Sequence, residues 1–322
     1  MSAEASTAAL APSRGANALP LRRLLIGLGW AAVSVAIFSG WFVVTRFSVL
    51  HVLRVWDVIA LRFGGGVVLL LPALLKTSYR LPRHALRNGL LLALMWGAPF
   101  VLLVAFGLRL TSAAQAAAVT PALMPVFAGL FGWIALREAP GVGRLLGYGA
   151  IIGGLVALVA GNALVSGAPS PAGIGALVLA AAMWAVYTLR FHRTGLTPLQ
   201  AAALVSLWSA LLFLPAYFLL GLSHLGEASL RELAFQALYQ GCLMSAVAII
   251  TFNRAVALLG AGAAAAIVAL LPVIASVMAI PVLGEIPTPL EGAAIAVIAF
   301  GVILAARPAR STPQSNRERR TP

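Results

Sequence analysis

The stretch Ala116-Ala-Ala-Val-Thr-Pro-Ala-Leu-Met-Pro125 decides the fold, because a second copy, Ala263-Ala-Ala-Ala-Ile-Val-Ala-Leu-Leu-Pro272, follows 147 residues later. The two copies run on in register to Arg137-Glu138 and Gly284-Glu285, and then to Gly154 and Gly301. Upstream, Leu71-Pro72-Ala73 aligns with Leu214-Pro215-Ala216 at an offset of 143. Internal repeats constrain a fold more strongly than any local feature. These repeats predict a chain built from two similar halves.

The composition indicates a membrane protein. Hydrophobic residues make up 61% of the chain and charged residues only 9%, whereas soluble domains contain about 25% charged residues. The mean hydropathy is +1.01. The chain is long enough for about ten spans of ~20 residues each with short connections.

The net charge of +14 at first suggests a nucleic-acid-binding protein, but the positions of the basic residues argue against this. If the N-terminus is cytoplasmic, 17 of the 22 basic residues face the cytoplasm. Only Arg46, Arg54, Arg109 and Arg231 face outward, and Arg62 lies within a span. This asymmetry follows the positive-inside rule and predicts that both termini are cytoplasmic.

Pro, Gly and charged residues divide the apolar sequence into ten predicted helices. The expected spans are 24–45, 55–75, 87–108, 112–135, 142–161, 172–190, 199–221, 233–256, 262–283 and 289–306. The first repeat is expected over 22–162 and the second over 163–306, with disordered cytoplasmic tails at 1–21 and 307–322. Because each half has five spans, an odd number, the second half must enter the bilayer from the opposite side. The predicted fold is an all-α polytopic membrane protein with ten transmembrane helices in two inverted five-helix repeats.

The repeated motif resembles the EamA-type drug/metabolite transporter superfamily. The similarity rests on a small-residue helix with a central Pro, a turn bearing Glu and a Gly-rich apolar helix, present twice, together with Ala60-Leu-Arg-Phe63, Arg109-Leu-Thr-Ser-Ala-Ala, Tyr239-Gln-Gly and Phe252-Asn-Arg-Ala-Val. The resemblance covers about residues 22 to 306 and implies solute export, with helices five and ten at the periphery. It does not identify the solute.

Polar side chains inside spans are costly and therefore mark a candidate solute path. Gln236, Tyr239 and Gln240 share one face of the eighth helix, since they are spaced by three and four residues. Their donors and acceptors carry no formal charge, which suits an uncharged, zwitterionic or aromatic solute. Interhelical hydrogen bonding, at ~0.6–2 kcal/mol per contact, explains the same pattern equally well.

Two further side chains are candidates for the path or for gating. Trp41 lies on a stripe of the first helix with Ser34, Phe38 and Thr45, where it either walls a cavity or packs in the core. Arg62 is the only basic residue well inside a span. It either snorkels to the outer interface or has a structural or gating role, which we favour over direct contact with the solute.

Prolines inside helices four and nine predict a matched interruption in both halves, which points to the binding site. These are Pro121 and Pro125 in one half and Pro272 in the other. Thr120 and Gln115 are the polar residues nearest to them in sequence and join the predicted path. A different set of small residues is expected to serve close helix packing, namely Gly149, Gly153, Gly292, Ala296 and Gly301.

No carboxylate lies in the middle of a predicted span, so the sequence contains no mid-membrane proton relay. Glu138 and Glu285 align with each other in the two repeats but lie on opposite membrane faces, where we expect them to pair with gate arginines. Flux is therefore expected to be facilitated, exchange-type or coupled through a gate carboxylate.

Enzyme chemistry finds little support. The four histidines lie in or beside loops without a second metal ligand at helical spacing, and no Walker-type loop is present. The single cysteine, Cys242, excludes an internal disulfide. We therefore expect no catalytic residue, metal or cofactor. The expected partners are a small-molecule solute and the lipid bilayer, with no nucleic acid, and a homodimer is left open.

The prediction is an inner-membrane secondary transporter that exports a small organic metabolite or drug by alternating access. A membrane-embedded sensor or assembly protein without flux is the alternative, and an intramembrane enzyme is a third class. Direction, coupling ion and solute are left open by the sequence.

Overall fold

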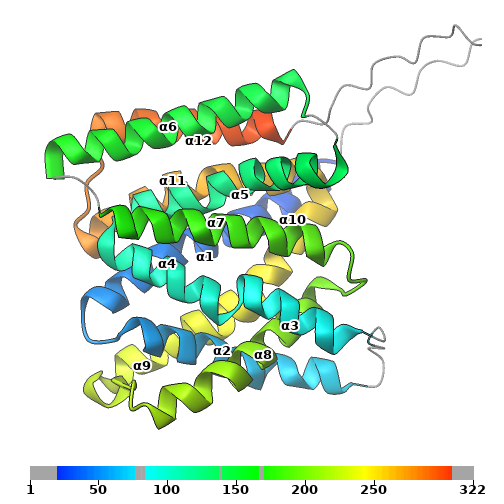
Figure 1. The fold of residues 1–322 in the computed structure, drawn as a ribbon, viewed down its shortest axis with the longest axis vertical. Helices are drawn as coiled ribbons and strands as arrows, with labels where there is room; N and C mark the ends of the chain where they lie inside the picture. Colours follow the sequence, from blue (N-terminus) through cyan, green and yellow to red (C-terminus); the bar gives the residue numbers. More distant parts are fainter. Residues whose placement is uncertain (1–19, 77–80, 82–83, 138–139, 167–169, 307–322) are drawn as a thin grey trace, which may run out of the picture.

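The computed structural model describes residues 20–76, 81, 84–137, 140–166 and 170–306. All regular secondary structure in this part of the chain is helical (Figure 1). The elements are α1 (Leu21–Leu50), α2 (Val55–Leu75), α3 (Ala85–Trp96), α4 (Ala98–Leu110), α5 (Ala113–Leu136), α6 (Val142–Ser166), α7 (Pro171–Phe191), α8 (Pro198–Leu219), η1 (Leu225–Glu227), α9 (Leu230–Gln236), η2 (Ala237–Val247), α10 (Ala248–Leu259), α11 (Ala261–Leu283) and α12 (Pro289–Ala305).

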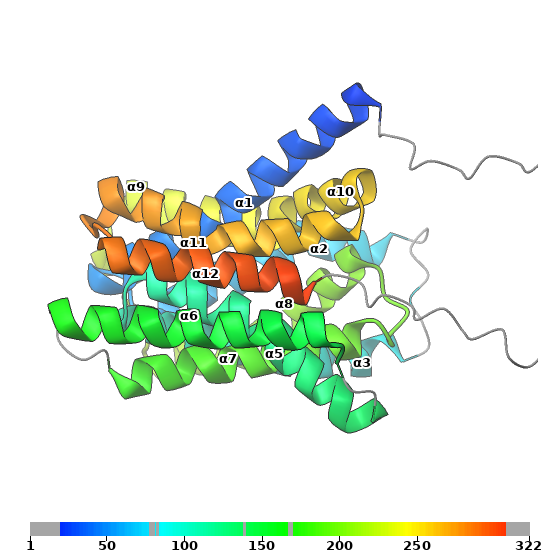
Figure 2. The ribbon, with the colours of Figure 1, turned by 90° about the horizontal axis from the view of Figure 1, so that it is seen from above.

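The ten expected spans are present among these described residues. Nine segments are long and apolar enough to cross a membrane, with α3 and α4 forming one of them and α9, η2 and α10 another. The tenth, α12, is apolar but has only 17 residues. The ends agree with the predicted ends to within a few residues, except that α1 and α6 are longer. The first turns of α1 reach beyond the rest of the bundle and expose apolar side chains such as Leu21 and Leu25 (Figure 2). Arg23 of these turns donates to the Leu258 carbonyl at the end of α10.

Repeated local signals begin and end these helices. Thr197 and Thr288 each cap a helix whose first residue is Pro, and the third helical residue, Gln200 or Glu291, completes a capping box. At the other terminus, α11 ends at Gly284 with a left-handed φ of 68°, a conformation that glycine adopts without steric cost. The aligned position of the first repeat is Arg137, which takes the same conformation at φ 56°.

The contacts between α6 and α12 show that the halves are inverted. A Cβ atom on Gly301 would meet the Gly147 carbonyl and Ile151, while one on Gly154 would meet the Ala294 carbonyl and Ile298. Each residue of one contact aligns with a residue of the other at the 147-residue offset, so the two contacts are equivalent by the repeat. The start of α6 therefore lies against the end of α12 and the end of α6 against the start of α12, so the aligned helices run antiparallel.

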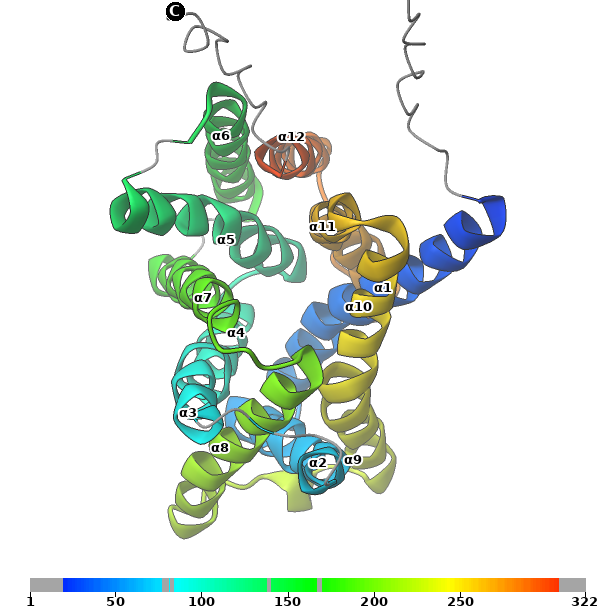
Figure 3. The same ribbon diagram turned by 90° about the vertical axis from the view of Figure 1, so that its right-hand side faces the viewer.

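The other helix pairs obey the same pseudo-two-fold symmetry. The packing of α1 against α10 and α11 is repeated by α7 against α4 and α5, and that of α2 against η2 by α8 against α3. Seen nearly end-on, α3, α4, α5 and α7 lie on one side and α1, α10 and α11 on the other (Figure 3). The α6–α12 pair lies at one edge (Figure 1), as the resemblance implied.

The prolines lie inside their helices, as the expected spans 112–135 and 262–283 require, because α5 and α11 continue through Pro121, Pro125 and Pro272. One prediction about helix packing was wrong, because the packing glycines differ from those expected. Gly301 is in contact, but a Cβ atom on Gly149, Gly153 or Gly292 would meet no atom within 4 Å. Spacing alone does not specify which face of an apolar helix is covered.

The third helix of each half also departs from regular α-helical geometry. In the first half, α3 and α4 are separated at Gly97, and in the second half the helix widens into the π-helical segment η2. A Cβ atom on Gly97 would meet Ser209 Oγ at 2.1 Å, and one on Gly65 would meet the Gly241 Cα atom at 2.7 Å. Gly97 aligns with Gly241 at an offset of 144, and Ser209 aligns with Gly66, the neighbour of Gly65, at the 143-residue offset of α2 and α8. Both irregular segments therefore lie at nearly equivalent close crossings.

Candidate functional site

The candidate site lies where η2 crosses α1 and α2. The Gly65–Gly241 approach brings the backbones of α2 and η2 together, because neither residue has a side chain to separate them. Ser245 Oγ lies 3.2 Å from both the Arg62 and the Gln240 carbonyl oxygens and donates to them. This hydroxyl group satisfies backbone acceptors where the helical hydrogen-bond pattern changes.

Five buried side chains form a hydrogen-bonded group that we call the amide cluster: Trp41, Thr45, Ser48, Gln236 and Gln240. Trp41 Nε1 donates to Gln240 Oε1 at 3.0 Å. Gln240 Nε2 donates to Thr45 Oγ1 at 3.2 Å and to Gln236 Oε1 at 3.4 Å, and Gln236 Nε2 donates to Ser48 Oγ. The cluster joins α1 of the first half to the third span of the second half by neutral polar contacts.

Tyr239 occupies the adjacent position but does not share these bonds. Its hydroxyl group donates to the Ile37 carbonyl at 2.9 Å, and a Cβ atom on Gly40 would lie 2.3 Å from that hydroxyl oxygen. Gly40 therefore makes room for the Tyr239 ring tip against α1. Tyr239 remains half-buried, beside the amide cluster rather than within it.

Arg62 lies inside the protein and does not snorkel to the interface. Its side chain is 4% exposed, and the guanidinium carbon lies 5.0 Å from the Trp41 ring centre and 5.8 Å from that of Phe63. Nη1 has no hydrogen-bond partner among the described residues. A desolvated cation–π contact stabilises the charge by about 2 kcal/mol. Desolvation of an unpaired buried ion costs on the order of several kcal/mol. These contacts leave the Arg62 charge incompletely compensated.

The other half places aromatic side chains at the equivalent position. Trp184 of α7 aligns with Trp41 at an offset of 143, and Trp96 of α3 aligns with Gln240 at an offset of 144. Where Trp41 bonds Gln240, Trp184 packs on Trp96 with ring centres 6.3 Å apart. Tyr187 stacks on Trp96 at 4.9 Å, and Phe100 lies 6.2 Å from Trp184. We call these four residues the aromatic cluster. Trp96 Nε1 within it is buried and has no acceptor among the described residues.

One end of the bundle is held together by Glu285, in an arrangement that we call the Glu285 bridge. Its carboxylate pairs with Arg46 of α1 through Oε1 and accepts the Ala113 backbone N–H of α5 at 2.9 Å through Oε2. Arg46 Nη1 also donates to the Leu108 carbonyl at the end of α4. A carboxylate at the N-terminus of α5 also meets the favourable end of the helix dipole. The bridge therefore connects both halves.

A buried carboxylate, that of Asp57, supports the same end. Asp57 is fully buried and accepts the Tyr217 hydroxyl at 2.5 Å, the His224 backbone N–H at 3.0 Å and the Arg54 backbone N–H at 2.8 Å. It thereby joins the start of α2 to the end of α8. The Asp57 carboxylate therefore binds three donors, none of which belongs to Arg62.

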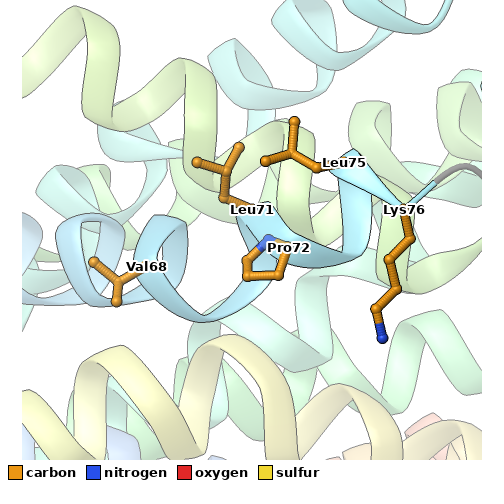
Figure 4. Close-up of a pocket in the computed structure, with 5 residues that line it drawn as sticks. All are labelled: Val68, Leu71, Pro72, Leu75 and Lys76. Carbon is orange, nitrogen blue, oxygen red and sulfur yellow. The ribbon is translucent and has the colours of Figure 1, made fainter.

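Cavities lie near the two ends of α2. One, of about 540 Å³, has the basic residues Arg54 and Arg109 in its wall. Its full lining is Val49, His51, Val52, Leu53, Arg54, Val55, Arg109 and Glu227. The second, of about 360 Å³, follows the last turns of α2 and is lined by Val68, Leu71, Pro72, Leu75 and Lys76 (Figure 4). Each cavity therefore has at least one basic side chain in its wall.

The predicted site residues separate into three groups. Trp41, Gln236 and Gln240 come together directly, with Tyr239 beside them. Gln115 belongs to the capping box of α5, where its Nε2 is buried and has no partner in the part of the chain that the structure describes. Thr120 donates to the Leu177 carbonyl of α7 at 3.3 Å. The predicted gating residue Glu138 lies outside the described residues.

The prolines Pro125 and Pro272 lie inside continuous helices, and a hydroxyl group bonds the backbone beside the second of them. Ser39 of α1 donates to the Leu271 carbonyl at 3.1 Å, and Ser276 donates to the Pro272 carbonyl at 2.7 Å. The aromatic cluster and Ser48 were missed by the sequence analysis. Alignment of Trp96 with Gln240 through the repeat would have revealed the former.

The arrangement provides polar groups that can bind a ligand. No group of three or more metal-ligating side chains occurs in the part of the chain that the structure describes. The buried polar groups around η2 are amides, hydroxyls, an indole and a guanidinium. Together they offer hydrogen-bond donors and acceptors beside the Trp41 and Phe63 rings.

Comparison with known proteins gives a consistent result. The model of the EamA-like transporter family matches residues 25–160 and 171–307. Fifteen chains of solved structures match; one, described as "Crystal structure of protein", has a TM-score of 0.57 and 18% identity, covering 87% of this chain and 96% of that chain. At this identity the likeness concerns the fold alone. No curated protein matches.

Proposed function

Because the chain belongs to the EamA-like transporter family, whose members are membrane transporters rather than enzymes, we propose that it is a secondary transporter that exports a small organic solute. The transported solute is uncharged, zwitterionic or amino-acid-like. The protein resides in the inner membrane with both termini in the cytoplasm, where the positive-inside rule places its basic connections.

The observation that carries this proposal is the amide cluster between the inverted halves. Trp41 belongs to the first repeat and Gln240 to the second, and their hydrogen bond breaks whenever the halves separate at this point. A solute with its own donors and acceptors replaces such bonds. Inverted repeats around a central site permit alternating access, because exchanging the conformations of the halves opens the opposite side.

The Glu285 bridge supplies the closed end in this mechanism. It ties α1, α4 and α5 to the connection that follows α11, so that this end opens only when the ion pair separates. The equivalent carboxylate of the first half, Glu138, takes the corresponding role at the other end. The gate function of both residues is part of the proposal.

Solute flux in proteoliposomes tests the proposal directly, with Gln240→Leu as the variant. Loss of its hydrogen bonds with Trp41 and Thr45 weakens solute binding by ~1–3 kcal/mol, whereas folded yield stays near that of the wild type. Thr251→Val is the matched control, since Thr251 is buried but bonds only the Ala248 carbonyl of its own helix.

The alternatives predict different outcomes. A sensor or assembly protein binds solute without flux, and an intramembrane enzyme converts it. If Gln240→Leu lowers yield and thermal stability in step with flux, Gln240 serves packing and the site assignment fails.

A further inference from the structure

We propose that Arg62 binds a carboxylate group of the transported solute, which restricts the solute to small organic acids and zwitterions that carry such a group. This inference rests on the proposed function; it requires a carboxylate group on the solute and adds simple organic acids to the proposed zwitterionic solutes. It also reverses our sequence-based preference for a purely structural or gating role of Arg62, and it excludes solutes without an anionic group.

The first argument is the position of the guanidinium group. Arg62 lies seven residues after the start of α2, which is about 10 Å along the helix axis at 1.5 Å per residue. It faces Trp41 and is shielded from solvent. The charge is therefore held at the amide cluster, on the proposed path, and not at the lipid headgroups.

The second argument is the lack of a protein anion. Among the described residues the ion pairs are Arg46–Glu285 and His224–Glu227. Asp57, the acidic residue nearest in sequence, already accepts three other donors. Arg62 Nη1 has no partner at all in this part of the chain. A buried cation in this state is stabilised most strongly by an anion that arrives from outside.

The third argument is the chemistry of the buried polar atoms that lack a partner among the described residues, of which Arg62 Nη1 lies beside the amide cluster. The buried polar atoms without a described partner include three N–H groups, those of Arg62 Nη1, Trp96 Nε1 and Gln115 Nε2. Trp96 belongs to the aromatic cluster and aligns with Gln240 of the amide cluster. Unused donors require an acceptor-rich ligand, and a guanidinium fork matches the two oxygens of a carboxylate.

The number of charges favours a carboxylate over a phosphate. One buried cation balances one negative charge, whereas a phosphate group near neutral pH carries more than one. The Trp41 and Phe63 rings beside the Arg62 guanidinium then provide an apolar surface for the rest of the solute. Basic side chains at both cavities, Arg54 and Arg109 at one end of α2 and Lys76 at the other, raise the local concentration of anions.

The test uses the full-length purified protein with variants Arg62→Met and Arg62→Lys. Thermal unfolding is first measured without solute. Arg46→Met is the matched control because it removes a cation that is paired, leaving Glu285 without its partner. We expect Arg46→Met to lower the Tm and Arg62→Met to leave it unchanged or raise it, since a buried cation without a counterion is removed.

Ligand binding is then measured with acid and amide pairs: phenylacetate and phenylacetamide, hexanoate and hexanamide, phenylalanine and phenylalaninamide. Inorganic phosphate serves as a second type of anion. Acids should raise the Tm of the wild type and their amides should not. Arg62→Met should weaken acid binding by at least about 10-fold, the loss of one charge-assisted hydrogen bond, and Arg62→Lys should retain part of it.

Three results would overturn the inference: a Tm of Arg62→Met as low as that of Arg46→Met, amides that bind as well as their acids, or phosphate as the only ligand. Failure of the proposed function is distinguishable from these. If acids bind through Arg62 but no solute of the panel crosses the membrane in proteoliposomes, the carboxylate site stands and transport fails.

Discussion

Replacement of Glu285 by Gln should open the end of the bundle that the Glu285 bridge closes. The carboxylate binds Arg46 through one oxygen and the Ala113 N–H through the other. Glutamine has nearly the same shape but only one acceptor oxygen, so its amide nitrogen faces one of these donors. The replacement also removes the negative charge at the start of α5.

The size of the effect follows from these contacts. One charge-assisted hydrogen bond contributes about 1.5–3 kcal/mol, and the charge at the helix terminus about 0.3–1 kcal/mol. The side chains of Arg46 and Glu285 are 16% and 22% exposed, so solvent screening places the loss near the lower end. We expect a shift of about 1–2 kcal/mol toward the open state, which is about a 5- to 30-fold increase in its population.

Labelling of a single cysteine measures this population. Val43 is 1% exposed and packs with Ala113 and Ala279 directly beneath the bridge. In a Cys242→Ala background, Val43→Cys should react with a hydrophilic maleimide only when this end opens. The rate should rise about 5- to 30-fold when Glu285→Gln is added.

The control is Glu227→Gln, which removes an exposed carboxylate near the same end and should leave the rate unchanged. Arg46→Gln should raise the labelling rate by itself. It should add little to Glu285→Gln, because both replacements break the same Arg46–Glu285 ion pair. A change of less than 2-fold, or a rate that rises only in step with a loss of Tm, would refute the gating role.

The packing of α6 on α12 predicts that Gly147→Ala lowers the Tm, because its Cβ atom would lie 2.5 Å from the Ala305 backbone nitrogen; Gly149→Ala, which meets open space, should be neutral or stabilising by up to ~1 kcal/mol. Equal Tm values would contradict the contact register. A reporter active only in the cytoplasm should be active when fused after Arg310, and activity of a periplasmic reporter there would reverse the orientation. The double replacement of Glu138 and Glu285 by Gln should slow counterflow in liposomes without abolishing solute binding. Strong pH-driven uphill accumulation that survives this replacement would contradict both the gate roles and the absence of a proton relay.

The sequence by itself determined the membrane class, the helix count and the inversion of the halves. Each follows from features that can be counted along the linear sequence. Lipid requires about 20 apolar residues per span, a fixed offset reveals the duplication, and an odd number of spans reverses the second copy. Polar residues on a helix inside the bilayer are costly enough to stand out without a structure, so Gln236 and Gln240 could be singled out.

Only the tertiary structure decided which of these groups meet. Apolar residues face lipid and protein alike in a membrane, so hydrophobic periodicity does not mark the buried face. For that reason Gly147 and Gly154, rather than Gly149 and Gly153, form the α6–α12 contact. The direction of the Arg62 side chain and the lack of a described anion beside it depend on how α1, α2 and η2 cross. Those crossings are determined by close backbone approaches between residues far apart in the chain, which no local pattern contains.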